Sequence, residues 1–264
     1  MGSNQDPNPL PFWQVNIPPE ERADVCPEYL QNSSAKDMAI MATRDEDYHV
    51  QTWDEAVDIV RTKRLGDFHR RPSELHRYRK YIWNLKREHG SVMNFMLKER
   101  LHWTEPVVPR GRKPFECGDD VAILMNDWPY GIDPRIVHLV VWTKFDLPDD
   151  PETEAEIERF VERTFSPGVS MDKCVWFKNP AALKSVHAIE HIHVLLYDPD
   201  PEFPRNSPQE SRANLLDFSN NYRCDRLPLG APTLARTSMI GASANGTAVG
   251  FSMLILTCQP SSPV

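Results

Sequence analysis

Residues 120–143 read DVAILMNDWPYGIDPRIVHLVVWT, and this stretch decides the fold that the sequence predicts. Two apolar runs, 120–126 and 136–143, are rich in β-branched residues, as strands commonly are. The segment between them, 127–135, contains Pro, Gly and Asp, the residue types that turns require. We therefore expect an antiparallel β-hairpin with His138 in its second strand.

Two more strands are expected farther along the chain. Residues 173–178 and 189–197 are apolar runs of strand length, and Asn179-Pro180 turns the chain between them. A helical pattern begins at Asp150-Pro151, between the hairpin and these strands. This order of elements predicts an α+β fold with an antiparallel sheet.

Helical signals occupy the segment before the hairpin. Residues 52–55 (TWDE) have the form of a capping box, in which a hydroxyl and a carboxylate satisfy exposed backbone amides. Arg71-Pro72-Ser73 marks the start of a second helix, and Gly90-Ser91 separates it from a third that ends at His102-Trp103. We expect a helical hairpin or small bundle packed on the sheet.

Proline is concentrated outside these periodic segments, and 24 of the 264 residues are proline. Proline-rich segments of this kind favour arms, loops and tails over packed elements. The expected organisation is a flexible arm at 1–44, one α+β domain at 45–198 and a tail of low order at 199–264. Within the domain, residues 45–103 form the helical part and residues 117–198 form the sheet part.

The charge of the chain limits the partners that we expect. A net charge of −8 argues against a protein that is held to nucleic acid by bulk positive charge. Residues 51–113 are nevertheless rich in arginine and lysine. The basic helices at 61–87 form a solvated face or meet an acidic protein partner. A further alternative is anion binding by Arg61, Arg64, Arg70 and Arg71.

The sequence predicts neither export nor membrane association. The N-terminal residues MGSNQDPNPL lack the apolar core of a secretory signal. The late apolar run at 251–256 is far too short to cross a bilayer. We expect a cytoplasmic protein.

Three histidines lie in or near the last expected strand. Successive side chains of a strand point to opposite faces, so His191 and His193 share one face, and His187 shares it if the chain stays extended. Two imidazoles on a rigid strand suit metal ligation, phosphate binding or nucleophilic attack on phosphorus. The simpler alternative is a polar rim on a half-buried strand.

Several segments in order resemble the fungal N-acetylglucosamine-induced protein family, which has no established activity. They are the helix containing Trp53, RPSEL at 71–75, ERLHW at 99–103, ILMNDWPYGI at 123–132, IVHLVVWTK at 136–144, WFKNPAALKSV at 176–186 and IEHIHVLL at 189–196. The resemblance covers residues from about 45 to 198. It implies cytoplasmic residence and a link to amino-sugar metabolism, without implying a mechanism.

A more distant resemblance is to the histidine triad superfamily of nucleotide hydrolases and nucleotidyl transferases. In that superfamily an N-x-x-P-Y bend precedes a strand with G-H-x-L-V-V, and a later S-V segment leads into a strand with alternating histidines. The corresponding residues here are Asn126, Tyr130, His138, Ser185, His191 and His193. The resemblance implies that one of the last two imidazoles attacks the α-phosphorus. The other binds a phosphate oxygen or passes a proton to the leaving group.

The chain departs from this superfamily at three points. A third histidine would stand at position 189 or 195, which hold Ile189 and Leu195. The branch that acts on sugar nucleotides has Gln where Leu195 stands, and Ser185 lies one residue farther than usual from the first histidine of the pair. Shared fold and shared catalysis are therefore separate questions.

The expected site combines catalytic and substrate-binding residues from these motifs. The catalytic candidates are His138, His191 and His193, and the substrate-binding candidates are Asn126, Tyr130, Lys144, Asn179, Ser185 and His187. Ser185 and a nearby backbone amide would hold the oxyanion. We expect a phosphate or nucleotide-sugar ligand, with no cofactor and no bound metal.

Three functions remain open at this point. The first is a nucleotide or nucleotide-sugar hydrolase or transferase, and the second is a non-catalytic regulator or scaffold. The third is a metal-dependent enzyme with His187, His191 and His193 as ligands. The third is weakened because the residues that follow His193 are apolar or aromatic, whereas the cupin pattern places a glutamate there.

Overall fold

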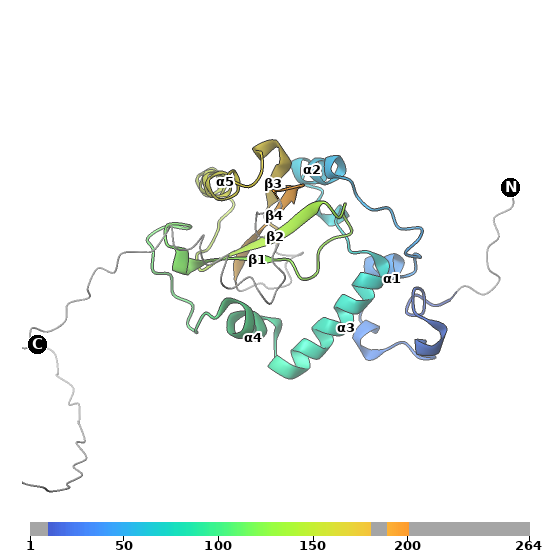
Figure 1. Cartoon of the computed structure of the whole chain (residues 1–264). Helices are drawn as coiled ribbons and strands as arrows, with labels where there is room; N and C mark the ends of the chain where they lie inside the picture. The colour runs from blue at the N-terminus through green and yellow to red at the C-terminus, as the bar shows by residue number, and fades with distance from the viewer. Residues whose placement is uncertain (1–9, 181–188, 201–264) are drawn as a thin grey trace, which may run out of the picture. The chain divides into compact units, whose positions relative to one another are not determined.

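A four-stranded antiparallel sheet with helices on both faces forms the centre of the protein, as a computed structural model shows (Figure 1). The structure describes residues 10–180 and 189–200, all within the unit Met1–Asp225. The strands lie in the order β1-β2-β4-β3 and comprise β1 (Val121–Met125), β2 (Ile136–Thr143), β3 (Cys174–Phe177) and β4 (Glu190–Tyr197). The expected α+β class with an antiparallel sheet is confirmed.

The hairpin of β1 and β2 forms as the sequence predicts, with Met125 opposite Leu139. Its bend is held by backbone hydrogen bonds to earlier segments of the chain. The Gln51 amide donates to the Gly131 carbonyl (3.1 Å), and the Gly131 amide donates to the His69 carbonyl (2.9 Å). The bend is therefore fastened to the helical part of the protein.

The first three α-helices start at residues that can cap a helix or begin one. Ser34 caps α1 (Ala35–Met41). Thr52 and Glu55 form the predicted capping box at the start of α2 (Trp53–Arg61). The long helix α3 (Pro72–His89) has proline in its first turn and ends before Gly90, whose φ of 77° suits glycine.

The predicted third helix of the helical part divides into two kinds of turn. One α-turn, α4 (Val92–Phe95), is followed by a π-helix, η4 (Met96–Leu101). A π-helix needs one more residue per hydrogen-bonded turn than an α-helix, and the sequence periodicity does not reveal this change. Leu97 and Leu101 of η4 are buried against the sheet.

The remaining helices connect or cover the strands. Asp150 caps α5 (Pro151–Phe165) by accepting the Thr153 amide hydrogen. Short 3₁₀ turns are η1 (Pro19–Glu21), η2 (Glu28–Leu30), η3 (Leu65–Asp67), η5 (Gly118–Asp120) and η6 (Met171–Lys173). None of the helices in the described ranges is both long and apolar enough to span a bilayer.

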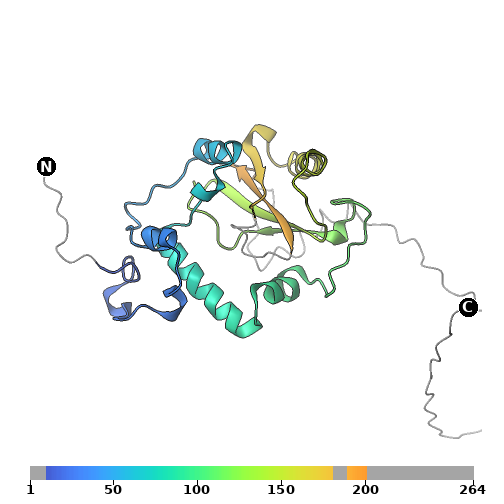
Figure 2. The same cartoon turned by 180° about the vertical axis from the view of Figure 1, so that it is seen from behind.

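The two faces of the sheet are covered differently. On the first face, α5 buries Ile157, Phe160 and Phe165 against Val141 and Val194. The second face has two separate apolar clusters, one around α2 and one around α4 and η4. Figure 2 shows α2 and α5 on either side of the β3–β4 end of the sheet. Between the two clusters, the second face carries the histidines.

The helix α3 packs on other helices more than on the strands. Residues 10–44, expected to be an arm, lie against it, and Leu30 and Met41 are buried together with Leu75 of α3. In both views α1 lies beside one end of α3, and α4 continues from the other end (Figure 1 and Figure 2). Between these ends, Tyr78 and Tyr81 of α3 contact Trp128 of the bend.

Replacing Gly131 by alanine should destabilise the protein, because a Cβ atom there would lie 2.2 Å from the Tyr48 hydroxyl oxygen. That hydroxyl lies within hydrogen-bond distance of the His69 and Gly131 carbonyls. We expect Gly131→Ala to lower the free energy of unfolding, measured in urea, by about 1–3 kcal/mol.

Gly66→Ala is the matched control, because a Cβ atom there has no neighbour within 4 Å. Its effect should stay below about 0.5 kcal/mol. Equal stabilities of the two variants would contradict the proposed crowding at Gly131.

Candidate functional site

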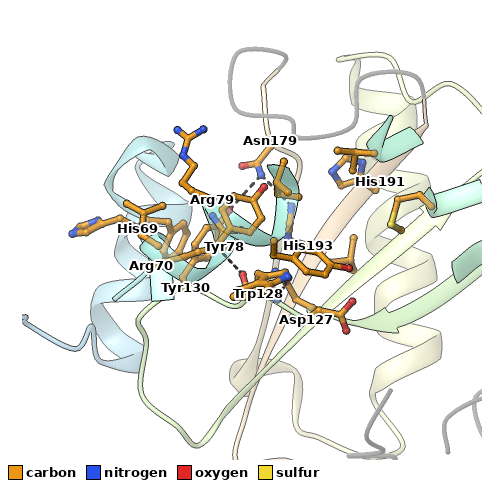
Figure 3. A pocket seen from close by; sticks show the side chains of 18 of the residues that line it. His69, Arg70, Tyr78, Arg79, Asp127, Trp128, Tyr130, Asn179, His191 and His193 are labelled. Atoms are coloured by element: carbon orange, nitrogen blue, oxygen red, sulfur yellow. Dashed lines mark hydrogen bonds between the residues drawn. The ribbon is translucent and has the colours of Figure 1, made fainter. Parts of the chain in front are cut away.

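A cavity of about 430 Å³ lies between the second face of the sheet and α3. Figure 3 shows His191 and His193 beside it, with Asn179, Tyr130 and Trp128 near His193. The sheet contributes side chains from β1, β2 and β4, while α3 and η4 form the opposite wall. The cavity therefore brings together the helical and sheet parts of the chain.

The strand β4 places His191 and His193 on the second face, as the alternation predicts. Ile192 between them is fully buried in the core of the first face. The two imidazoles are only 4% and 7% exposed, and their ring centroids lie 5.5 Å apart. Both line the cavity, so two of the three catalytic candidates face the same space.

His191 is oriented by a backbone carbonyl. Its Nδ1 lies 3.0 Å from the carbonyl oxygen of Ile189, which can only accept a hydrogen bond. In the neutral ring the proton is therefore on Nδ1, and Nε2 is the unprotonated nitrogen. Trp142 packs against the imidazole with ring centroids 4.4 Å apart. The environment thus fixes both the plane and the tautomer of this ring.

His193 is paired with His138 from the neighbouring strand. Nε2 of His138 lies 2.9 Å from Nδ1 of His193. Burial is the main cause that lowers the pKa of His138 from 6.5 to about 3 and the pKa of His193 well below 6.5. The positive charge of Arg70 also lowers both. Both rings are therefore neutral near pH 7.

Two neutral imidazoles have two N–H protons for four ring nitrogens, and their neighbours decide where these protons lie. Asn126 Oδ1 accepts the Trp128 amide hydrogen (3.0 Å), so its Nδ2 faces His138 as a donor at 3.3 Å. The Asn126 Nδ2 is equally far from both nitrogens of His138, and the arrangement in which Nδ1 of His138 accepts places the His138 proton on Nε2, toward His193. The second proton is then on Nε2 of His193.

Asn179 lies at the far end of this hydrogen-bonded chain. Its Nδ2 is 3.0 Å from Nε2 of His193, while its Oδ1 is buried without a hydrogen-bond partner. Because the two ends of a carboxamide have nearly the same shape, the reversed amide places Oδ1 where it accepts the His193 proton. In that orientation Nδ2 of Asn179 takes the buried position that has no hydrogen-bond partner, so one polar group at this end of the chain stays unsatisfied.

The other predicted substrate-binding residues lie in different places. Tyr130 packs against His138, with ring centroids 5.1 Å apart, and burial raises its pKa. Lys144 is not brought to the cavity, because its Nζ lies 3.2 Å from the Asp120 carboxylate. Ser185 and His187 fall outside the described residues.

Trp128, Arg100 and Asp127 line the cavity and were not predicted as site residues, whereas Arg70 was named from the sequence as one of four alternative anion-binding arginines. Arg70 and Trp128 flank the bend, and Arg100 of η4 forms an ion pair of 2.9 Å with Asp127. Burial raises the pKa of Asp127, although Arg100 opposes this effect. The sequence places these residues in three separate segments, and no spacing rule connects them.

The basic helices at 61–87 have much of their charge balanced within the chain. Arg61 and Arg64 form ion pairs with Asp58, and Arg77 forms one with Glu74. Exposed pairs of this kind contribute little to stability, but they reduce the open positive charge of the surface. The surface therefore offers a docking acidic partner less charge than the composition suggests.

No arrangement of three His, Cys, Asp or Glu side chains within 10–180 and 189–200 is suited to hold a metal ion. The metal-dependent hypothesis needs His187 as its third ligand, which lies outside these ranges. His193 already has contacts at both ring nitrogens. Of the two proposed ligands within the described ranges, His191 presents the tautomer that a metal at Nε2 requires.

Comparisons with known proteins agree on one group of relatives. The model of the family described as "Protein of unknown function (DUF3605)" matches residues 52–197. The protein is 31% identical to N-acetylglucosamine-induced protein 1 of Candida albicans over 58% of this chain and 70% of that protein. It is also 31% identical to Uncharacterized protein YPL067C of Saccharomyces cerevisiae over 56% of this chain and 79% of that protein.

A solved structure titled "Crystal Structure of HTC1" is also similar to this chain. The sequence identity is 27% and the TM-score is 0.49. The match covers 65% of this chain and 94% of the other.

Lowering the pH from 6.5 to 5 should reduce the free energy of unfolding through the two buried histidines. An unfolded histidine titrates near 6.5, whereas the pKa of His138 in the folded protein is about 3, so the unfolded chain binds more protons between these values. Each such histidine should cost about 1.4 kcal/mol per pH unit across this window. Urea denaturation at pH 6.5, 6.0, 5.5 and 5.0 measures the slope.

His138→Gln should make that slope shallower, because one buried imidazole is lost. His49→Gln is the matched control, since His49 is exposed and lies 2.9 Å from Glu55. A slope in His138→Gln as steep as in the wild type would show that the pair does not carry the pH dependence.

Proposed function

The chain belongs to the DUF3605 family of proteins of unknown function, together with fungal N-acetylglucosamine-induced protein 1, and on this premise we propose that it is a nucleotide or nucleotide-sugar hydrolase or transferase. The observation that carries the proposal is the state of His191. A backbone carbonyl holds its Nδ1 proton, and the ring lines a cavity of small-molecule size. These are the requirements for an imidazole nucleophile.

In the proposed first step, the Nε2 lone pair of His191 attacks the α-phosphorus of the substrate. A P–N bond forms while the P–O bond to the leaving group breaks. The leaving group is a phosphate or sugar phosphate, which departs as an anion with the bonding electron pair and needs no proton. The Ile189 carbonyl stabilises the positive charge that develops on the imidazole.

In the proposed second step, water or an acceptor hydroxyl attacks the phosphorus. The P–N bond breaks, its electron pair returns to Nε2 of His191, and the attacking oxygen loses its proton to solvent. His193 and His138 act as positioning residues, because their pair holds the floor of the cavity in one hydrogen-bonded arrangement. Ser185 remains the proposed oxyanion holder of this scheme.

The choice of substrate class draws on the family and on the distant resemblance to the histidine triad superfamily. The name of the Candida relative records induction by N-acetylglucosamine. We extend that link to this chain and propose UDP-N-acetylglucosamine as the first substrate to test, with the cytoplasm as the place of action. The aromatic walls formed by Tyr81, Trp128 and Trp142 suit a planar base.

His191→Ala should lower turnover of UDP-N-acetylglucosamine by at least about 100-fold, because the nucleophile is lost. Product release measured by chromatography, for the wild type and the variant, checks this. His49→Ala is the matched control, since it removes an exposed imidazole that faces solvent beside α2.

A screen of other nucleotides and nucleotide sugars extends the same assay. If the wild type turns over none of them although a ligand raises its melting temperature, the protein is a non-catalytic binder. Equal turnover by the wild type and His191→Ala would remove His191 from the mechanism.

A further inference from the structure

We infer that Arg70 is the anion-binding residue of the cavity and holds a phosphate group of the ligand beside the histidine strand. The inference rests on the proposed function for the identity of the substrate. It adds the residue that recognises the phosphate, and it applies whether or not the bound phosphate reacts.

Two rings and one carbonyl hold the Arg70 guanidinium in place. Its central carbon lies 3.9 Å from the centroid of the Tyr78 ring and 5.9 Å from that of the Tyr130 ring. Its Nε donates to the carbonyl oxygen of Trp128 at 3.1 Å (Figure 3). Aromatic faces and a single carbonyl fix the position of a cation without neutralising its charge.

Arg70 differs from the other two arginines that line the cavity. Arg79 is paired with Asp37, and Arg100 is paired with Asp127 at 2.9 Å. Arg70 forms no ion pair with any carboxylate of residues 10–180 and 189–200, and its two terminal nitrogens donate to no protein group there. A partly buried cation without a counter-charge favours an anionic ligand.

The position of Arg70 agrees with this role. Its charge lowers the pKa of both His138 and His193, so it lies within electrostatic range of the histidine pair. It also lines the same cavity as His191. An anion at the terminal nitrogens of Arg70 would therefore lie close to the imidazoles.

Phosphate suits this guanidinium better than an anion with a single acceptor atom would. Because Nε is already engaged, the two terminal nitrogens remain to donate in parallel to two oxygens of one phosphate. The aromatic residues around Trp128 offer a surface for the uncharged part of a nucleotide. The ligand class is thus a phosphate ester with a planar base, and inorganic phosphate supplies the same anion without the base.

Calorimetric titration of the full chain tests this assignment with four probes, namely inorganic phosphate, UMP, UDP-N-acetylglucosamine and uridine. Arg70→Gln should weaken the three phosphate-containing probes by about 10-fold or more, because a charge-assisted hydrogen-bonded pair is lost. It should leave uridine within about twofold of the wild type. Arg77→Gln removes an exposed arginine of the same helix and should change no affinity.

Three results would overturn the assignment: no binding of any phosphate probe to the wild type, UMP binding to Arg70→Gln as tight as to the wild type, or an equal weakening of uridine. If Arg70→Gln does not fold, Arg70→Lys replaces it, because an ammonium keeps the charge without the two-pronged geometry. That variant should weaken UMP several-fold, and unchanged affinity would again overturn the assignment.

His191→Ala separates this inference from the proposed function. It should bind UMP as the wild type does while losing turnover. Binding that depends on Arg70, in a wild-type protein without turnover, would support the anion site and refute the enzyme. Turnover with a KM unchanged in Arg70→Gln would refute the anion site alone.

Discussion

A hydrogen bond between the buried imidazoles of His138 and His193 constrains the second face of the sheet. It joins β2 to β4 through side chains, inside a face that is otherwise largely apolar. Two buried imidazoles are tolerated there only if their nitrogens find partners, because an unsatisfied buried polar group costs about 1–3 kcal/mol. This requirement explains the amides of Asn126 and Asn179 at the two ends of the pair.

The same constraint gives the two histidines of β4 different chemistry. His193 and His191 share a face, a strand and nearly the same exposure. His193 faces another imidazole and a carboxamide, so its nitrogens serve the structure. His191 faces a carbonyl, which fixes one proton and leaves Nε2 as the basic nitrogen. The local partner, more than burial, distinguishes the hydrogen bonding of the two rings.

Much of the fold could be predicted because its signals are local. The hairpin, the capping box at Thr52 and the alternation around Ile192 depend on residues within one turn or one strand. The π-helix at 96–101 could not be predicted, since its hydrogen-bond spacing depends on the packing of Leu97 and Leu101 on the sheet.

The site was only partly predictable for a similar reason. The alternation of His191 and His193 on one strand predicts that they share a face. Lys144 was predicted to bind substrate, but it forms an ion pair with Asp120. The sequence does not distinguish Arg70 from the arginines near it. The structure does, because Arg61 and Arg64 pair with Asp58 whereas Arg70 donates to a backbone carbonyl.

The place of α3 as one wall of the cavity has a consequence for how the sequence of this helix can change. A helix rises about 1.5 Å per residue, so the 18 residues of α3 span about 27 Å. Its side chains Tyr78 and Tyr81 line the cavity and contact Trp128, so the residues at these positions shape one cavity wall. Substitution along α3 would therefore change the lining of the cavity at single positions, while insertion or deletion in it would move many lining side chains at once.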